Sequence, residues 1–128
     1  MPIQYKKFIS RQMVQGNPET LFVFGDNVKR SGHRGQAAQM RGEPNTIGIP
    51  TKWYPTLKTD AFFYDHQIDQ IRPLMEADYL TVENHLLNGK TVIWPADNIG
   101  TGLSRIPSNA PILWQWMEEV RTYFDQIV

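Results

Sequence analysis

Two apolar segments of this chain each run into a polar loop that contains glycines. Residues 21–25 (LFVFG) lead into a loop through residue 36, and residues 91–94 (TVIW) lead into a loop through residue 104. Short continuous apolar runs are typical of strands covered on both faces of a parallel sheet. Ligands of such sheets bind at the carboxyl ends of the strands, where glycines let backbone amides approach a phosphate and a following helix adds a favourable dipole. The two segments therefore predict a cleft for a phosphorylated ligand.

Strand and helix signals alternate along the rest of the chain. Strands are predicted at residues 4–11, 21–25, 46–49 and 91–94, and helices at residues 35–41, 65–87 and from Ser108 to about Ile127. Residues 16–20 have the composition of a turn. The alternation predicts an α/β fold in a single domain, residues 1–128, with a mostly parallel sheet that carries helices on both faces.

Two details of the predicted helices follow from single residues. Pro73 lacks an N–H and clashes with the preceding turn, so we expect it to kink the helix at 65–87 or to start a second helix. Ser108 is expected to cap the last helix, because its hydroxyl can accept a hydrogen bond from a free amide of the first turn. The apolar stripe of that helix is predicted to be Ile112, Trp116, Val120 and Phe124.

The composition excludes several classes of function. The absence of cysteine rules out a disulfide framework, a thiolate zinc site, an iron–sulfur cluster and a cysteine nucleophile. His66 and His85 do not have the spacing of metal ligands, and we predict neither a metal nor a cofactor. With 13 basic and 13 acidic residues the net charge is zero, which argues against nucleic acid as a general polyanion partner. No signal-peptide pattern and no apolar run near about 18 residues occur, so we expect a cytoplasmic protein with no membrane partner.

The charges are unevenly distributed along the chain. Residues 26–42 hold one acid and a basic set, whereas residues 60–83 hold six acids against Arg72 alone. The basic set is Lys29, Arg30, His33, Arg34 and Arg41. These segments could be two solvated faces, or the first could supply a positive field for a small anion. The sequence leaves both interpretations open.

Three side chains near the predicted cleft could carry catalysis. Asp26 follows a buried strand, as does Asn27, and both could bind sugar hydroxyls or orient a water; the alternative is an Asx-turn that caps the loop. His33 could transfer a proton near neutral pH, although a solvated histidine beside glycine is common. Lys52 follows the strand at 46–49 and could reach across the cleft or be solvated. Asp26, His33 and Lys52 are therefore the candidate catalytic residues.

The second loop contains Gly100 and Gly102 in a G-x-G pattern. It lacks the spacing of a dinucleotide fingerprint and the lysine of a P-loop, so a tight turn is the alternative explanation. The aromatic segment 53–64 could stack on a base or could form a lid of the core.

Four segments together resemble a macrodomain. They read F-V-F-G-D-N, G-H-R-G-Q-A-A, I-G-I-P-T-K and V-I-W-P-A-D-N-I-G-T-G-L-S-R-I-P-S-N-A-P, and the resemblance covers residues 21–116. The chain is most similar to small macrodomain-like proteins of phages and bacteria. That resemblance implies a three-layer α/β/α fold with a central mixed, mostly parallel sheet. It also implies ADP-ribose, or an ADP-ribosylated protein, as the partner.

The resemblance assigns roles to residues of both loops. Asn27 matches an asparagine that contacts the distal ribose, and residues 99–103 match the loop that wraps the diphosphate. The residues we expect to bind the ligand are Asn27, Gly32, Gly35, Gln36, Ala37, Asp97, Ile99, Gly100, Thr101, Gly102, Leu103 and Ser104. Gly16 and Asn17 stand where many macrodomains have a Gly-Asp pair that contacts adenine.

The chain also departs from the macrodomain pattern. Lys52 resembles a lysine that one branch uses as a nucleophile toward the ribose, but Ser104 stands where that branch has an aspartate. We therefore expect a protein that binds ADP-ribose or an ADP-ribosyl derivative, with hydrolysis of an ADP-ribosyl linkage or of ADP-ribose-1″-phosphate as a further activity. The alternatives are a binding module without catalysis and a phage interaction protein that kept only the fold.

Overall fold

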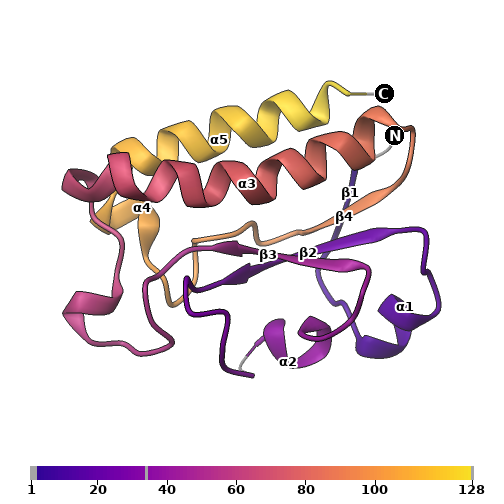
Figure 1. Cartoon of the computed structure of the whole chain (residues 1–128), viewed down its shortest axis with the longest axis horizontal. Helices are drawn as coiled ribbons and strands as arrows, with labels where there is room; N and C mark the ends of the chain where they lie inside the picture. Colours follow the sequence, from indigo (N-terminus) through magenta and orange to yellow (C-terminus); the bar gives the residue numbers. More distant parts are fainter. Residues whose placement is uncertain (1–2, 34, 128) are drawn as a thin grey trace.

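A four-stranded, entirely parallel sheet forms the centre of the structure, a computed structural model that describes residues 3–33 and 35–127 (Figure 1). The strands lie in the order β1, β4, β2, β3. Their bounds are β1 Ile3–Lys6, β2 Leu21–Asp26, β3 Thr46–Pro50 and β4 Val92–Pro95. In the register, Val23 lies beside Ile47 on one side of β2, and Leu21 lies beside Val92 on the other. The prediction of an α/β protein with a mostly parallel sheet is confirmed, but the mixed sheet that the resemblance implied is wrong, because every strand pair of the described residues is parallel.

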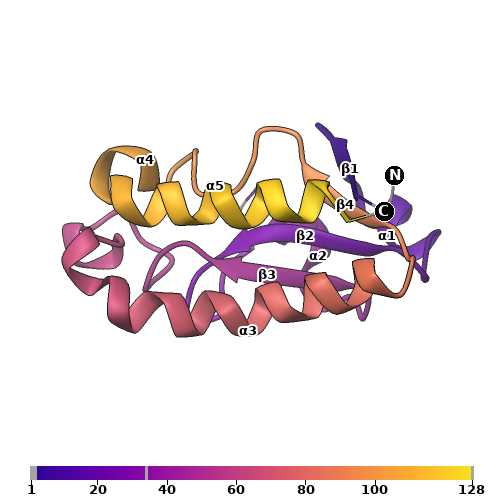
Figure 2. The same ribbon diagram turned by 90° about the horizontal axis from the view of Figure 1, so that it is seen from above.

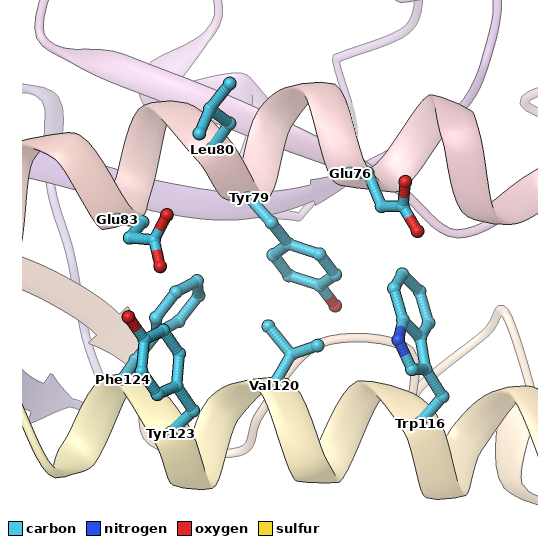
Figure 3. A pocket seen from close by; sticks show the side chains of 8 residues that line it. All are labelled: Glu76, Tyr79, Leu80, Glu83, Trp116, Val120, Tyr123 and Phe124. Carbon is cyan, nitrogen blue, oxygen red and sulfur yellow. The ribbon is translucent and has the colours of Figure 1, made fainter.

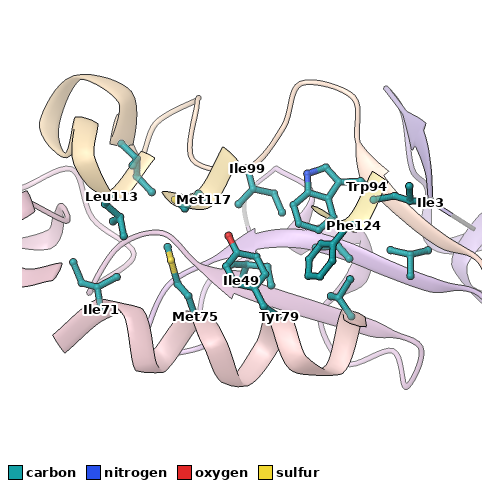
Figure 4. Close-up of a cluster of buried hydrophobic side chains, with 14 of the residues drawn as sticks. Ile3, Ile49, Ile71, Met75, Tyr79, Trp94, Ile99, Leu113, Met117 and Phe124 are labelled. Atoms are coloured by element: carbon teal, nitrogen blue, oxygen red, sulfur yellow. The ribbon is translucent and has the colours of Figure 1, made fainter. Parts of the chain in front are cut away.

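Alternate side chains of the strands enter two apolar cores, one on each face of the sheet, because successive strand residues point to opposite sides. On one face, residues such as Val23 and Trp94 pack against the long helices α3 (Ile68–Leu87) and α5 (Pro111–Asp125). The two helices run in nearly the same direction (Figure 2), and Figure 4 shows part of the core beneath them, including Trp94. On the other face, Phe24 and its neighbours pack against the short helices α1 (Arg11–Gln15) and α2 (Ala37–Met40).

Helix α3 runs without interruption through Pro73, so the expected start of a second helix there is wrong. The 3-10 turn η2 (Asp65–Gln67) leads into it, and a second 3-10 turn, η1 (Thr59–Ala61), precedes that. The buried face of α3 follows the helical period and consists of Ile71, Met75, Tyr79, Val82 and Leu86. Of the helices that the structure describes, none combines the length and apolar character that crossing a membrane requires.

Two predicted element boundaries are wrong. Strand β1 ends at Lys6, and the segment predicted as its continuation turns into α1, which the Ser10 hydroxyl caps by accepting from the Met13 amide at 3.1 Å. Ser108 does not cap the last helix, because it lies inside the one-turn helix α4 (Ile106–Asn109).

Helix α5 begins at Pro111 and is capped from a distant part of the chain. The Asp65 carboxylate accepts from the amides of Ile112 and Leu113 at 3.1 and 3.0 Å. Ile112 is 62% exposed, whereas Leu113 is buried with Met117 and Phe124. The predicted stripe is therefore wrong at its first position.

Candidate functional site

A cleft of about 540 Å³ lies at the carboxyl ends of the strands, within the usual size range of small-molecule sites. Each strand delivers a residue to it: Lys7 after β1, Asn27 after β2, Lys52 after β3 and Asp97 after β4. Strands β2 and β4 are neighbours, but the chain leaves β2 toward α2 on one face and leaves β4 toward α5 on the opposite face. Such a reversal is the usual ligand position of open α/β sheets.

Every predicted site residue except Thr101 lines this cleft. The Thr101 hydroxyl instead donates to the Asp97 carbonyl at 2.7 Å, within the loop. Arg34, part of the predicted first loop, lies outside the described residues. The lining residues predicted from the sequence are Asp26, Asn27, Gly32, His33, Gly35, Gln36, Ala37, Lys52, Asp97, Ile99, Gly100, Gly102, Leu103 and Ser104.

Arg41 lines the cleft, although the sequence did not assign it to the site, and it makes several contacts there. Its guanidinium donates to both carboxylate oxygens of Asp26, at 2.5 and 3.1 Å, and also to the carbonyls of Gly32 and Ser31. The Asp26 side chain is 3% exposed, and its Oδ1 accepts from the Asn27 amide as well. With both oxygens engaged, Asp26 is arranged to hold the first loop rather than to take a proton from water.

Arg30 fixes the other side of the same loop. Its guanidinium donates to the Gly48 carbonyl and to the Asp78 carboxylate of α3, and it lies 3.7 Å from Asp26. Burial raises the pKa of Asp78, and the hydrogen bond from Arg30 opposes that rise. A Cβ at Gly48 would lie 2.5 Å from Asp26 Oδ2, so glycine is required there for the carboxylate to fit. Arg30 and Arg41, two of the basic residues of this segment, therefore neutralise acids of their own chain.

Two amide side chains of the cleft contain buried acceptor oxygens without partners. The Asn27 Nδ2 donates to the Ser31 carbonyl at 2.8 Å, which orients the amide, while Asn27 Oδ1 has no partner among the described residues. Gln36 Oε1 is likewise buried and has no hydrogen-bond partner among the described residues. Leaving such a group unsatisfied costs about 1–3 kcal/mol, so a ligand hydroxyl that reached either oxygen would remove a penalty.

The second loop is held from within and from α5. Asn98 has a φ of +70°, and its Oδ1 accepts from the Ile99 amide at 2.8 Å and from Trp94 Nε1 at 3.0 Å. Its Nδ2 donates to Glu118 of α5 at 2.6 Å. Gly100 has a φ of +88°, and a Cβ there would lie 2.9 Å from Ile106 Cδ1. The loop conformation is therefore set before any ligand arrives.

The backbone amides of residues 100–104 donate no hydrogen bond to any part of the chain that the structure describes. Four of these five residues line the cleft; Thr101 does not. The helices that follow the two loops, α2 and α4, contain four residues each, so the predicted contribution of a helix dipole is small. Consecutive unpaired amides are an anion-binding arrangement in their own right.

A family model described as "Family of unknown function (DUF7831)" matches residues 4–120. The chain belongs to DUF7831. No curated protein and no solved structure matches it.

In this DUF7831 protein the other predicted side chains have distinct surroundings. Lys52 Nζ donates to the Thr56 carbonyl at 3.1 Å and lies 6.0 Å from the centre of the Phe62 ring. His33 is exposed at the cleft, and Ser104 is buried there. Of the histidine, aspartate and glutamate side chains in the described ranges, no group of three or more could hold a metal ion.

Gly16 and Asn17, which stand where many macrodomains have a Gly-Asp pair, precede β2 at the amino-terminal end of the sheet, and neither lines the cleft. In the aromatic segment, Phe63 is fully buried and packs edge-on against Trp53 at 5.0 Å, as a lid of the core would.

Proposed function

We propose that this protein binds ADP-ribose, or an ADP-ribosyl group carried by a protein, in the cleft. One observation carries the proposal: the same cleft contains a run of unpaired amide donors and two unpaired amide acceptors. Donors suit a diphosphate, and the oxygens of Asn27 and Gln36 suit ribose hydroxyls. The macrodomain resemblance supports this assignment, and helices on both faces of the sheet are compatible with a three-layer macrodomain-like fold.

Binding without turnover is the form of the proposal that the contacts favour. Both oxygens of Asp26 are engaged by Arg41, and Lys52 directs its amine to a backbone carbonyl. Hydrolysis is the second candidate because His33, an exposed titratable side chain, lines the cleft and could activate a water. A phosphate or a protein-linked ribose would be the group attacked.

Calorimetry with ADP-ribose tests binding, with Gly102→Glu as the variant and Gly102→Ala as its control. A Cβ at Gly102 meets nothing within 4 Å and its φ is unstrained, so both variants should keep the melting temperature. The added carboxylate should repel the diphosphate and lower affinity at least about tenfold, whereas alanine should bind normally. Normal binding by Gly102→Glu would mean that the diphosphate lies elsewhere.

Turnover is tested separately with an ADP-ribosylated protein and with ADP-ribose-1″-phosphate. Release of ADP-ribose by the native protein, lost in His33→Ala with binding retained, would establish the hydrolase. Binding with no release at high protein concentration selects the binding module. No binding of ADP-ribose at all leaves the interaction-protein alternative.

A further inference from the structure

A second concave surface lies between α3 and α5, on the face of those helices away from the ligand cleft. Its lining residues share no member with the cleft and are Glu76, Tyr79, Leu80, Glu83, Trp116, Val120, Tyr123 and Phe124. We name this surface the α3–α5 groove. Its volume is about 220 Å³, below the usual range for small-molecule sites but adequate for one long side chain.

The groove has aromatic walls and a carboxylate near each end. In Figure 3, Glu76 lies opposite Trp116, and Glu83 lies opposite Tyr123 and Phe124. Glu83 also accepts a hydrogen bond from Tyr123, which raises the pKa of that tyrosine. Aromatic faces beside carboxylates are the surroundings that a guanidinium prefers, because ring and acid both attract the cation.

One end of the groove already shows this recognition within the chain. The Arg72 guanidinium lies 4.6 Å from the centre of the Trp116 ring and 3.7 Å from Glu76. Arg72 is also the one cation in the acidic segment 60–83. The Glu83 end has the same pairing of an acid with aromatic rings, and no Lys or Arg is recorded there in the part of the chain that the structure describes.

The floor of the groove contains an unused hydrogen-bonding group. Tyr79 is 6% exposed, and no hydrogen bond of its hydroxyl is found in the described structure. Figure 3 shows this hydroxyl directed across the groove toward α5, between Val120 and Trp116. Its ring is fixed by edge contacts with Trp116 at 5.6 Å and Phe124 at 5.8 Å.

We propose that the α3–α5 groove is a docking site for an arginine side chain of a protein partner, with the guanidinium between Glu83 and the aromatic rings beside it. The aliphatic stem of the arginine packs on Val120 and Phe124, and the Tyr79 hydroxyl meets a polar atom of the incoming chain. This contact gives Glu83, an acid of the segment 60–83, a role that ligand binding in the cleft does not give it.

The test uses the whole chain and a minimal probe, N-acetyl-arginine methylamide. Its neutral isostere, the citrulline derivative, is the matched control. Side-chain NMR signals of Trp116, Tyr79 and Tyr123 are followed during titration. The arginine probe should shift these signals and bind about tenfold more tightly than the citrulline probe, because only a cation gains from the rings and the acid.

Variants locate the contact. Glu83→Gln should weaken the arginine probe severalfold, and Tyr79→Phe should weaken it less, while both keep the fold as judged by the melting temperature. Glu119→Gln, an exposed glutamate of α5 outside the groove, should leave the affinity unchanged. Equal binding of the two probes, equal effects of Glu83→Gln and Glu119→Gln, shifts confined to the cleft, or no shift up to ~50 mM probe would each overturn the proposal. A dimer that Glu83→Gln dissociates would also overturn it, because a second copy would then occupy the groove.

Discussion

Replacing Arg41 by methionine tests how the floor of the cleft is held. Arg41 donates to both oxygens of an Asp26 carboxylate that is 3% exposed. Breaking a buried ion pair from one side costs about 3–5 kcal/mol, because the other charge stays buried without its partner. Arg30, 3.7 Å from the same carboxylate, remains and keeps the loss at about 3 kcal/mol. At ~4 °C per kcal/mol for a domain of this size, the melting temperature should fall by about 12 °C.

Urea unfolding of the double variant Asp26→Asn/Arg41→Met separates the buried charge from lost packing. The double variant contains no uncompensated carboxylate, so it should be more stable than Arg41→Met alone by at least about 1 kcal/mol. Lys90→Met is the control, because its ion pair with Glu19 at 3.7 Å is exposed, and it should change stability by no more than about 0.5 kcal/mol. A loss in Arg41→Met no larger than this control, or a double variant less stable than the single one, would refute the reasoning.

Three further predictions concern single side chains. Gly48→Ala should lower the free energy of unfolding by about 1–3 kcal/mol in urea, because its Cβ would lie 2.5 Å from Asp26 Oδ2; a neutral effect would mean that the carboxylate moves freely. Glu118→Ala should weaken ADP-ribose binding severalfold in calorimetry, and Glu118→Gln should retain it, because an acceptor on this residue holds Asn98 at 2.6 Å; identical affinities would show that the loop does not depend on this bond. Burial, followed by the charges of nearby carboxylates, raises the pKa of Tyr79 above its unfolded value, so this group's stabilisation is present below about pH 10 and is lost as the pH rises further. Tyr79→Phe should flatten that alkaline loss in urea unfolding, and an unchanged pH profile would contradict the assignment.

Strands β2, β3 and β4 were predictable because most of their residues are apolar and buried. Strands covered on both faces need continuous apolar runs, and the predicted runs at 21–25, 46–49 and 91–94 each lie within two residues of the observed strands. The position of the cleft was predictable for a related reason, because the loops after parallel strands meet at one edge of the sheet. Knowing which loops follow the strands was therefore enough to place almost every predicted site residue in the cleft.

Helix α1 was not predictable, because distant residues hold it. The guanidinium of Arg11 bonds to Glu43 and to the carbonyls of Ala38 and Arg41, which belong to or follow α2. The Asn45 side chain also bonds to a distant segment, because its amide donates to the carbonyls of residues 14, 17 and 20. A five-residue helix has too few internal bonds to show in the local pattern.

The role of the basic segment could not be read from its charges either. A count of charges gives the first loop a positive field, but whether an arginine faces a ligand or an acid of its own chain depends on how the loop folds. Arg41 reaches back fifteen residues to Asp26, and Arg30 reaches Asp78 on α3, so both cations are used within the fold. Lys7 and Lys52 are the other described Lys or Arg side chains that line the cleft. A diphosphate in this cleft would therefore meet the neutral backbone amides of residues 100–104 as well as these two lysines, and α5 fixes the second loop through Glu118 and Asn98.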